Sequence, residues 1–216
     1  MPDPLSVLRA PRRMHYSPDN ELRACIARYL RILLAKSTKQ IKGHMPAQMP
    51  LWGGVRINYG GDVIRCASAV QTRHRSNERD ASYIRVSTIV YCPVLHAHQF
   101  FDLQYEVVVG SANRRTVYYG RLEKILECNL PDNDIFWGDL QGSRLLLAVI
   151  TPCVTTGRDA TQTPTFYRSE QQSQVVVDLR TVQGVVGRVS SRGKWCIIDR
   201  SHDIARTVFV DNDDDE

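Results

Sequence analysis

Residues 116–126 constrain the fold more than any other stretch of this chain. Apolar Val, Tyr, Leu and Ile side chains alternate there with charged ones, and these apolar types favour the pleated, half-buried surface of a β-strand. Gly120 lies inside the run, where a glycine indicates a bulge or a close approach of another backbone. We therefore predict that this stretch forms the central strand of a small antiparallel β-barrel-like domain. Its predicted neighbours are residues 144–150, 174–179 and 182–189.

A single amphipathic helix near the N-terminus is predicted over residues 18–35. Apolar side chains recur there at spacings of three and four and form one stripe along the helix. Ser17 is expected to cap the helix, and Pro18 suits its first position. Leu30 and Leu33 belong to the stripe, so we expect both to be buried against the barrel.

Further strands are indicated on both sides of the central one. The predicted strands are residues 55–57, 63–70, 82–91, 100–110 and 195–198, with a short strand at 135–137. Residues 100–110 are expected to form a hairpin with the central strand. Residues 36–50 show little periodicity and are expected to be a linker. Residues 151–173 form a long polar loop, and loops of this length are commonly functional or disordered.

The two ends of the chain differ in composition from its middle. Residues 1–16 contain three prolines and three arginines and are expected to be a basic disordered arm. Residues 211–216 contain five acidic residues. They are expected to be an acidic disordered tail, because like charges repel and nothing apolar is left to bury. Residues 17–210 then form a single β-rich domain, which is a normal length for one.

The overall composition predicts a folded protein without a membrane span. The chain is 43% hydrophobic and 24% charged, and it contains no apolar run of roughly 18 residues. Its first residues, Met-Pro-Asp-Pro-Leu, do not have the pattern of a secretory signal, so an intracellular location is expected. The six cysteines form no Cys-x-x-Cys pair and lie in or beside apolar runs. They are expected to be reduced and buried.

Positive charge is concentrated in the first part of the chain. Residues 1–82 carry 14 Lys and Arg against 6 Asp and Glu, a net charge of +8, whereas residues 83–216 carry a net charge of −3. A basic surface can bind the phosphates of nucleic acid, although a solvated sheet face would have the same composition. The candidate nucleic-acid-binding residues are Arg12, Arg13, Arg56, Arg65, Arg73, Arg75 and Arg79.

Several aromatic residues lie near predicted strand ends and loops. Were they to converge, they would form a cage for a cation or a platform on which bases stack. The alternative is that they fill the core, because aromatic side chains bury large apolar areas. The candidates are Phe136, Trp137, Phe166, Tyr167 and Trp195.

The sequence contains no recognisable catalytic motif. Gly-x-Ser-x-Gly, Gly-x-Gly-x-x-Gly and the phosphate-binding Gly-Lys-Ser/Thr are all missing, and the carboxylates follow no motif spacing. Cys92, His96 and His98 partly match a metal-ligand pattern, but no fourth ligand accompanies them. We therefore predict a protein that is not an enzyme and that binds no cofactor and no metal.

Four short segments carry a family resemblance. They are Gly-Asp-Val-Ile-Arg-Cys-Ala-Ser-Ala at 61–69, Arg-Asp-Ala-Ser-Tyr-Ile-Arg at 79–85, Tyr-Gly-Arg-Leu-Glu-Lys-Ile at 119–125, and the run 176–200 that ends in Gly-Lys-Trp-Cys-Ile-Ile-Asp-Arg. Together they resemble the C-terminal region of proteins encoded by fungal, CACTA-like DNA transposons, over about residues 18–200. The resemblance implies an accessory domain, since the nuclease domain of such proteins lies elsewhere. The second half is also similar to bromo-adjacent-homology (BAH) barrels, which bind chromatin.

These observations predict a non-enzymatic interaction module that associates with chromatin or nucleic acid, possesses no membrane segment and acts in the nucleus of a fungal host. One alternative is a protein–protein interaction scaffold whose basic residues only maintain solubility. The other is an enzyme remnant. Clustering of the candidate arginines on one face would favour nucleic acid, whereas scattering would favour the scaffold.

Overall fold

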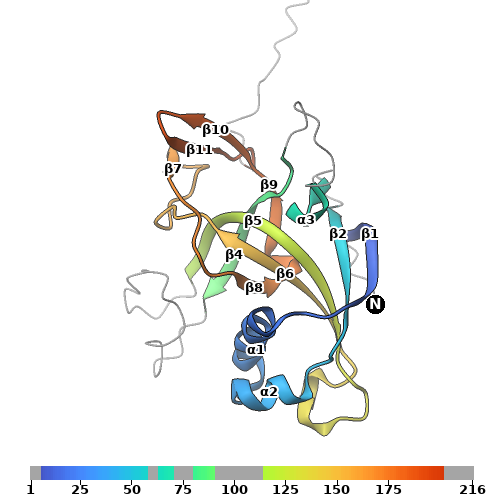
Figure 1. The fold of residues 1–216 in the computed structure, drawn as a ribbon. Helices are drawn as coiled ribbons and strands as arrows, with labels where there is room; N and C mark the ends of the chain where they lie inside the picture. The colour runs from blue at the N-terminus through green and yellow to red at the C-terminus, as the bar shows by residue number, and fades with distance from the viewer. Residues whose placement is uncertain (1–5, 58–62, 71–79, 91–113, 202–216) are drawn as a thin grey trace, which may run out of the picture.

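The computed structural model describes residues 6–57, 63–70, 80–90 and 114–201, and its architecture is mostly β with antiparallel sheets (Figure 1). Eight of the described strands form one large sheet, and three form a smaller one. The large sheet contains β1 (Ser6–Tyr16), β2 (Met49–Ile57), β3 (Val63–Arg65), β4 (Tyr83–Val90), β5 (Arg114–Asn129), β6 (Arg144–Pro152), β8 (Val175–Asp178) and β9 (Val182–Val185). The small sheet contains β7 (Thr165–Tyr167), β10 (Gly187–Ser191) and β11 (Lys194–Ile198).

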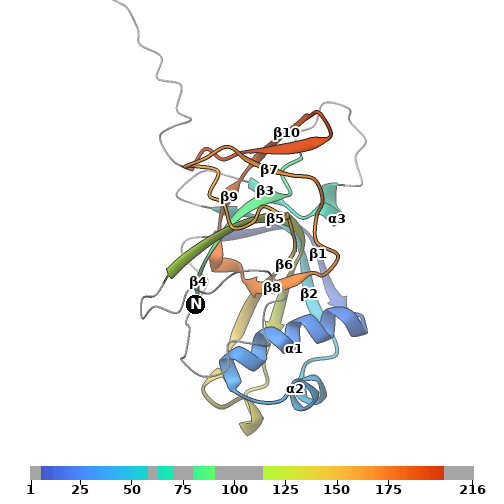
Figure 2. The same cartoon turned by 90° about the vertical axis from the view of Figure 1, so that its left-hand side faces the viewer.

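Helices cover and connect these sheets. They are α1 (Asn20–Leu34), α2 (Thr38–His44), α3 (Ala67–Val70) and the 3₁₀-helices η2 (Ile135–Leu140) and η3 (Leu179–Thr181). Figure 2 shows α1 and α2 at one end of the large sheet, with the small sheet at the opposite end. No helix in the described part of the chain is long and apolar enough to cross a membrane.

The long, curved strand β5 is the centre of the large sheet. It pairs with β4 along its first half, with β6 along its second half, and with β2 where Leu126 lies opposite Leu51. The predicted neighbour 144–150 is therefore found in β6. Gly120 makes the expected close approach, since a Cβ there would lie 2.8 Å from the carbonyl oxygen of Thr151. Residues 100–110, the predicted hairpin partner, lie outside the described residues.

The predicted barrel is not closed by hydrogen bonds between the described strands. The sheet has the open order β1-β2-β5-β4-β9, with β6 and β8 branching from β5 and with β3 paired to β2. The predicted neighbours 174–179 and 182–189 do not contact β5 as strand partners, because β8 pairs with β6 and β9 pairs with β4. The turn η3 carries the chain from one to the other.

The expected disordered arm is wrong over residues 6–16, which form β1. This strand pairs with β2 from Ser6 opposite Ile57 to Tyr16 opposite Met49. Pro11 had argued against a strand, but it lies where the register shifts between Arg9 and Arg12. An edge position with such an irregularity tolerates the missing N–H of a proline. Residues 1–5 and the expected tail at 211–216 lie outside the described residues.

Helix α1 lies within the predicted range, but a strand precedes it and its start is different. Asp19, not Ser17, is the N-cap, and its side chain accepts a hydrogen bond of 2.8 Å from the backbone N–H of Leu22. Leu30 is fully buried as expected, whereas Leu33 is 49% exposed. The buried stripe is therefore narrower than the sequence pattern, and Leu33 faces solvent.

Three other predicted elements need correction. Residues 36–50 contain α2, where Ser37 and Gln40 form a reciprocal capping box, a signal present in the sequence. The strand predicted at 63–70 ends with β3, and α3 follows because the Val70 N–H donates to the Cys66 carbonyl. Residues 135–137 belong to a 3₁₀-helix capped by Asp134, whose side chain accepts from Phe136 N–H.

The apolar interior consists of three clusters. The first core packs α1 and α2 against the sheet and includes Ile26, Leu30, Ile41, Leu126 and Trp137. The second core lies on the other side of the sheet and includes Val55, Ile64, Ile84, Leu122 and Ile150. The third core joins the small sheet to the large one through Tyr83, Tyr119, Cys153, Tyr167, Val186 and Ile197.

The five described cysteines are free thiols. Cys66, Cys128 and Cys153 are buried, and burial raises the pKa of each thiol to about 12. Cys25 and Cys196 are only partly buried, so the expectation of burial is wrong for these two. Cys92 lies outside the described residues.

Candidate functional site

Three arginines share one face of the strands β1, β2 and β3. Arg9 on β1 and Arg65 on β3 both lie opposite Gly54 on β2, while Arg56 lies two residues along β2 from that glycine. Directly opposed residues of an antiparallel pair point to the same side of the sheet, and so do residues two apart. All three arginines are exposed. We call this surface, with the exposed Val7 and Val63 opposite Arg56, the basic face.

The intervening residues explain why the arginines point outward. Leu8, Val55 and Ile64 form the row between the two arginine rows. Val55 and Ile64 are buried in the second core, and Leu8 packs against it. The row with Arg9 and Arg65 has no side chain at its centre, because a Cβ on Gly54 would collide with the carbonyl oxygen of Ile64. Arg9 and Arg65 therefore lie on either side of a buried glycine.

Other arginines predicted to bind nucleic acid are arranged differently. Arg12 lies beyond the register shift, with its guanidinium carbon 4.4 Å from the centroid of the Trp52 ring and 3.6 Å from a carboxylate oxygen of the buried Glu127. Glu127 also accepts a hydrogen bond of 2.9 Å from Trp52 and forms an ion pair of 2.9 Å with Arg144. Arg12 thus neutralises a buried carboxylate, which is a structural role.

The remaining candidates divide between one exposed residue and a segment that is not described. Arg13 is exposed on β1 and lies opposite Leu51, away from the basic face. Arg73, Arg75 and Arg79 lie outside the described residues. Arg9 was missed as a site residue because the proline-rich start predicted no strand.

The five predicted aromatic residues do not converge on one platform. Phe136 and Trp137 belong to η2 near α2, whereas Phe166, Tyr167 and Trp195 belong to the small sheet at the opposite end of the molecule (Figure 1). Trp137 is fully buried in the first core. Phe136 stacks on His44 at 3.9 Å between ring centroids. These two rings therefore serve packing.

Part of the second aromatic group does form a cation cage, but the protein fills it with its own arginine. The guanidinium carbon of Arg188 lies 3.3 Å from the centroid of the Tyr83 ring and 4.5 Å from that of Trp195. Arg188 also donates a hydrogen bond of 3.0 Å to the Tyr167 hydroxyl and pairs with Asp80 at 3.3 Å. This cage fastens β10 to β4 and leaves no room for an external cation.

A buried ionic cluster lies next to that cage. Arg85 on β4 contacts Asp199 at 2.6 Å and donates two hydrogen bonds of 2.9 Å to Asp159 in the loop after β6. The Tyr119 hydroxyl donates to Asp199 at 2.7 Å and accepts from the Ala160 N–H at 2.9 Å. The side chains of Arg85 and Asp199 are 8% and 0% exposed, so the long loop is anchored in the interior.

The cluster is ionised because each carboxylate has several donors. Burial alone would raise the pKa of Asp159, but hydrogen bonds from Arg85 and Thr161 lower the pKa well below its usual range. The pKa of Asp199 is also lowered, because donors on Ser201, Arg85 and Tyr119 outweigh its burial. Burial and the hydrogen bond to Asp199 raise the pKa of Tyr119. Each charged group has a partner of opposite charge or a hydrogen-bond donor within the cluster, which indicates a structural ion cluster.

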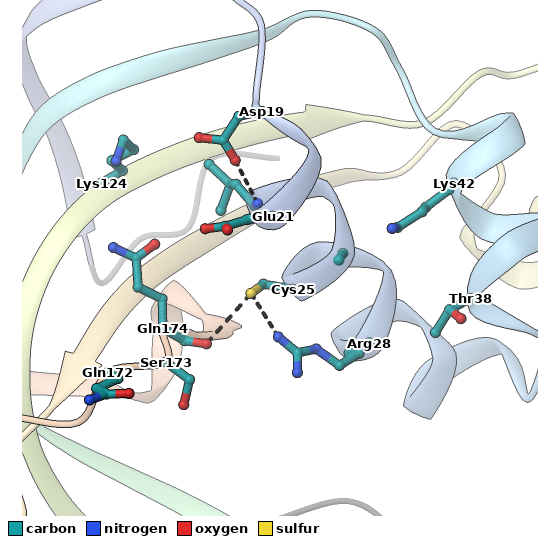
Figure 3. Close-up of a pocket in the computed structure, with 12 residues that line it drawn as sticks. Asp19, Glu21, Cys25, Arg28, Thr38, Lys42, Lys124, Gln172, Ser173 and Gln174 are labelled. Carbon is teal, nitrogen blue, oxygen red and sulfur yellow. Dashed lines mark hydrogen bonds between the residues drawn. The ribbon is translucent and has the colours of Figure 1, made fainter.

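An open pocket of about 650 Å³ lies between α1, α2 and the segment before β8 (Figure 3). The Cys25 thiol donates to the carbonyl oxygen of Gln174 at 3.6 Å and accepts from Arg28 at 2.9 Å. Asp19 also lines this pocket and caps α1. The thiol and the carboxylate therefore have partners within the fold, and the pocket contains no nucleophile paired with a general base.

The metal-ligand pattern noted in the sequence is not placed by the structure. Cys92, His96 and His98 lie outside the described residues. Within the described residues, no group of three or more His, Cys, Asp or Glu side chains is arranged to hold a metal ion.

Comparison with protein-family models, with curated proteins and with solved structures found no match. The candidate site therefore rests on its own geometry, and the basic face is the part of it where three exposed arginines share one side of a sheet.

Proposed function

We propose that this protein is a non-enzymatic module that binds nucleic acid through the basic face. The observation that carries the proposal is the arrangement of Arg9, Arg56 and Arg65 on one exposed side of β1, β2 and β3. The inward-facing row belongs to the second core, so these three guanidinium groups are presented by a rigid sheet. A rigid presentation reduces the entropy that is lost when a ligand binds.

Phosphates are the ligand groups that such a surface suits. Arginine presents a planar fork of N–H donors that matches a phosphate in two places. Phosphate contacts position a protein on nucleic acid without reading the bases, so binding would be independent of sequence.

The resemblance to transposon-encoded proteins and to BAH barrels is a second, weaker support. Under the proposal, the mostly antiparallel β domain is BAH-like, derives from a transposon and acts on chromatin in the nucleus of a fungal host. The face carries no acidic residue along 6–9, 54–56 and 63–65, as a nucleic-acid surface requires.

The test compares two triple variants with the same change in net charge. Arg9→Gln/Arg56→Gln/Arg65→Gln removes the basic face, and Lys39→Gln/Lys42→Gln/Arg158→Gln removes three exposed positive charges elsewhere. Binding of labelled duplex and single-stranded DNA is measured by fluorescence anisotropy at several salt concentrations. The parent protein should lose affinity steeply with salt, because counterions are released from the phosphates.

The basic-face variant should weaken binding to unrelated sequences alike and reduce the salt slope by about one for each lost contact. The matched control should keep most of the slope. Equal losses in both variants would show that only net charge matters. If the parent protein shows no DNA binding near physiological salt, the nucleic-acid proposal is wrong and the protein–protein interaction scaffold becomes the favoured function.

A further inference from the structure

The small sheet has an exposed apolar face that lies outside the three core clusters of the described residues. Phe166, Cys196 and Val189 lie opposite one another on β7, β11 and β10 and so form one row across the sheet. Ile198 follows two residues after Cys196 and points to the same side. Phe166, Val189 and Ile198 are 48%, 49% and 39% exposed, and Cys196 is partly buried. We call this surface the apolar face.

The orientation of the small sheet is fixed by its other side. Tyr167 and Ile197 are buried in the third core, Trp195 packs against it, and Arg188 is held between two aromatic rings. A shift of one residue would turn every side chain over, and it would expose these groups. The apolar face is therefore a defined surface of the fold. Neighbouring apolar side chains grouped on a surface are a mark of interaction sites.

The charges around the apolar face restrict what can cover it. Arg168 follows β7, Arg192 lies in the turn between β10 and β11, and Lys194 begins β11. All three are exposed, and residues 165–168 and 187–198 contain no acidic residue. A second copy of this chain that presented the same face would bring the same cations and be repelled. An acidic partner would be attracted and steered to the surface.

We propose that the apolar face is a docking surface for an acidic, apolar segment of a partner protein. Large aliphatic or aromatic side chains of that segment would cover Phe166 and Val189, and its carboxylates would pair with Arg168 and Lys194. Single-stranded nucleic acid fits less well, because only one of the four apolar side chains can stack on a base. The surface lies on different strands from the basic face and does not depend on the function proposed for it.

The probe is a labelled synthetic peptide in which Leu and Phe alternate with Glu, compared with the same peptide carrying Lys in place of Glu. Binding to the full chain is followed by fluorescence anisotropy. Phe166→Ser/Val189→Thr should weaken binding of the acidic peptide by at least about tenfold, as expected for loss of a central aromatic contact. The control Ile135→Ser, which alters a residue that is 87% exposed on η2, should bind as the parent does.

A second variant tests the same surface in case Phe166→Ser/Val189→Thr does not fold. Arg168→Gln/Lys194→Gln changes only exposed charges and should weaken binding and flatten its salt dependence. The proposal is overturned if the acidic peptide does not bind or if the Lys peptide binds equally well. It is also overturned if Phe166→Ser/Val189→Thr loses single-stranded DNA binding instead, or if sedimentation shows that these residues hold a dimer of this chain.

Discussion

Two groups of arginines in this protein differ in their surroundings although the sequence does not distinguish them. Arg85 and Arg188 are largely buried, and each is surrounded by carboxylates, hydroxyls or aromatic rings. Arg9, Arg56 and Arg65 are exposed and stand on one side of a sheet. The first group connects the small sheet and the long loop to the large sheet, whereas the second faces solvent. Burial, not residue type, decides which of these arginines are available to a ligand.

The largest expected effect is at Arg85. Arg85→Met should lower the free energy of unfolding by about 3–5 kcal/mol, because the buried Asp199 and the partly buried Asp159 would lose the cation that pairs with them. Urea denaturation monitored by fluorescence measures the change. In a background of Asp159→Asn/Asp199→Asn, the same Arg85→Met substitution should cost much less, since no buried charge is then left unpaired. Equal costs in both backgrounds would mean that packing, not charge, explains the role of Arg85.

An apolar pair on α1 provides a comparison for that effect. Leu30→Ala should cost about 2–5 kcal/mol, because Leu30 is fully buried in the first core. Leu33→Ala, three residues further on the same helix, should change the free energy of unfolding by less than about 0.5 kcal/mol, because Leu33 is half exposed. Similar losses at both positions would contradict the observed orientation of α1.

Arg188 should show an intermediate effect. Arg188→Met should cost about 1–3 kcal/mol, since it removes the contacts with two rings and the hydrogen bond to Tyr167. Arg188→Lys should recover only part of this loss, because an ammonium group lacks the planar fork that stacks between Tyr83 and Trp195. Full recovery by lysine would show that charge alone is required. Equilibrium denaturation of both variants gives the answer.

The dependence of stability on pH tests the buried ion cluster around Arg85. The pKa of Asp159 and that of Asp199 are lowered in the folded protein, so below the pKa of an unfolded carboxyl group, about 3.9, the unfolded chain binds more protons. The stability from these ion pairs is complete above that value and is lost as pH falls through the folded pKa. Asp159→Asn should start less stable at pH 6 and lose less stability between pH 5 and pH 3. If stability fell equally steeply with pH in the parent and the variant, the ion cluster would not be the cause of the acid sensitivity.

Local patterns in the sequence predicted some of the elements, missed β1 and α2, and did not predict the contacts between elements. Residues 116–126 and Gly120 have a strand pattern that β5 follows, and the capping signal Ser37-x-x-Gln40 marks α2. Arg85, Asp159 and Asp199 are brought together across separations of 74 and 114 residues, which no local pattern encodes. The aromatic candidates show the same limit, since the cage around Arg188 depends on which strands pair. Pro11 predicted irregular structure in residues 6–16, but a proline at an irregularity of an edge strand is compatible with that strand.

The smallest expected change in stability belongs to the basic face, and it completes the comparison. Each of Arg9→Gln, Arg56→Gln and Arg65→Gln should alter the free energy of unfolding by less than about 0.5 kcal/mol, because all three are exposed and the interactions of exposed charges contribute little to stability. The same residue type would then contribute several kcal/mol at position 85 and almost nothing at positions 9, 56 and 65. The measurement is urea denaturation at low and at high salt. A loss above about 1 kcal/mol at any of the three positions would assign that arginine a structural role and remove it from the proposed nucleic-acid surface.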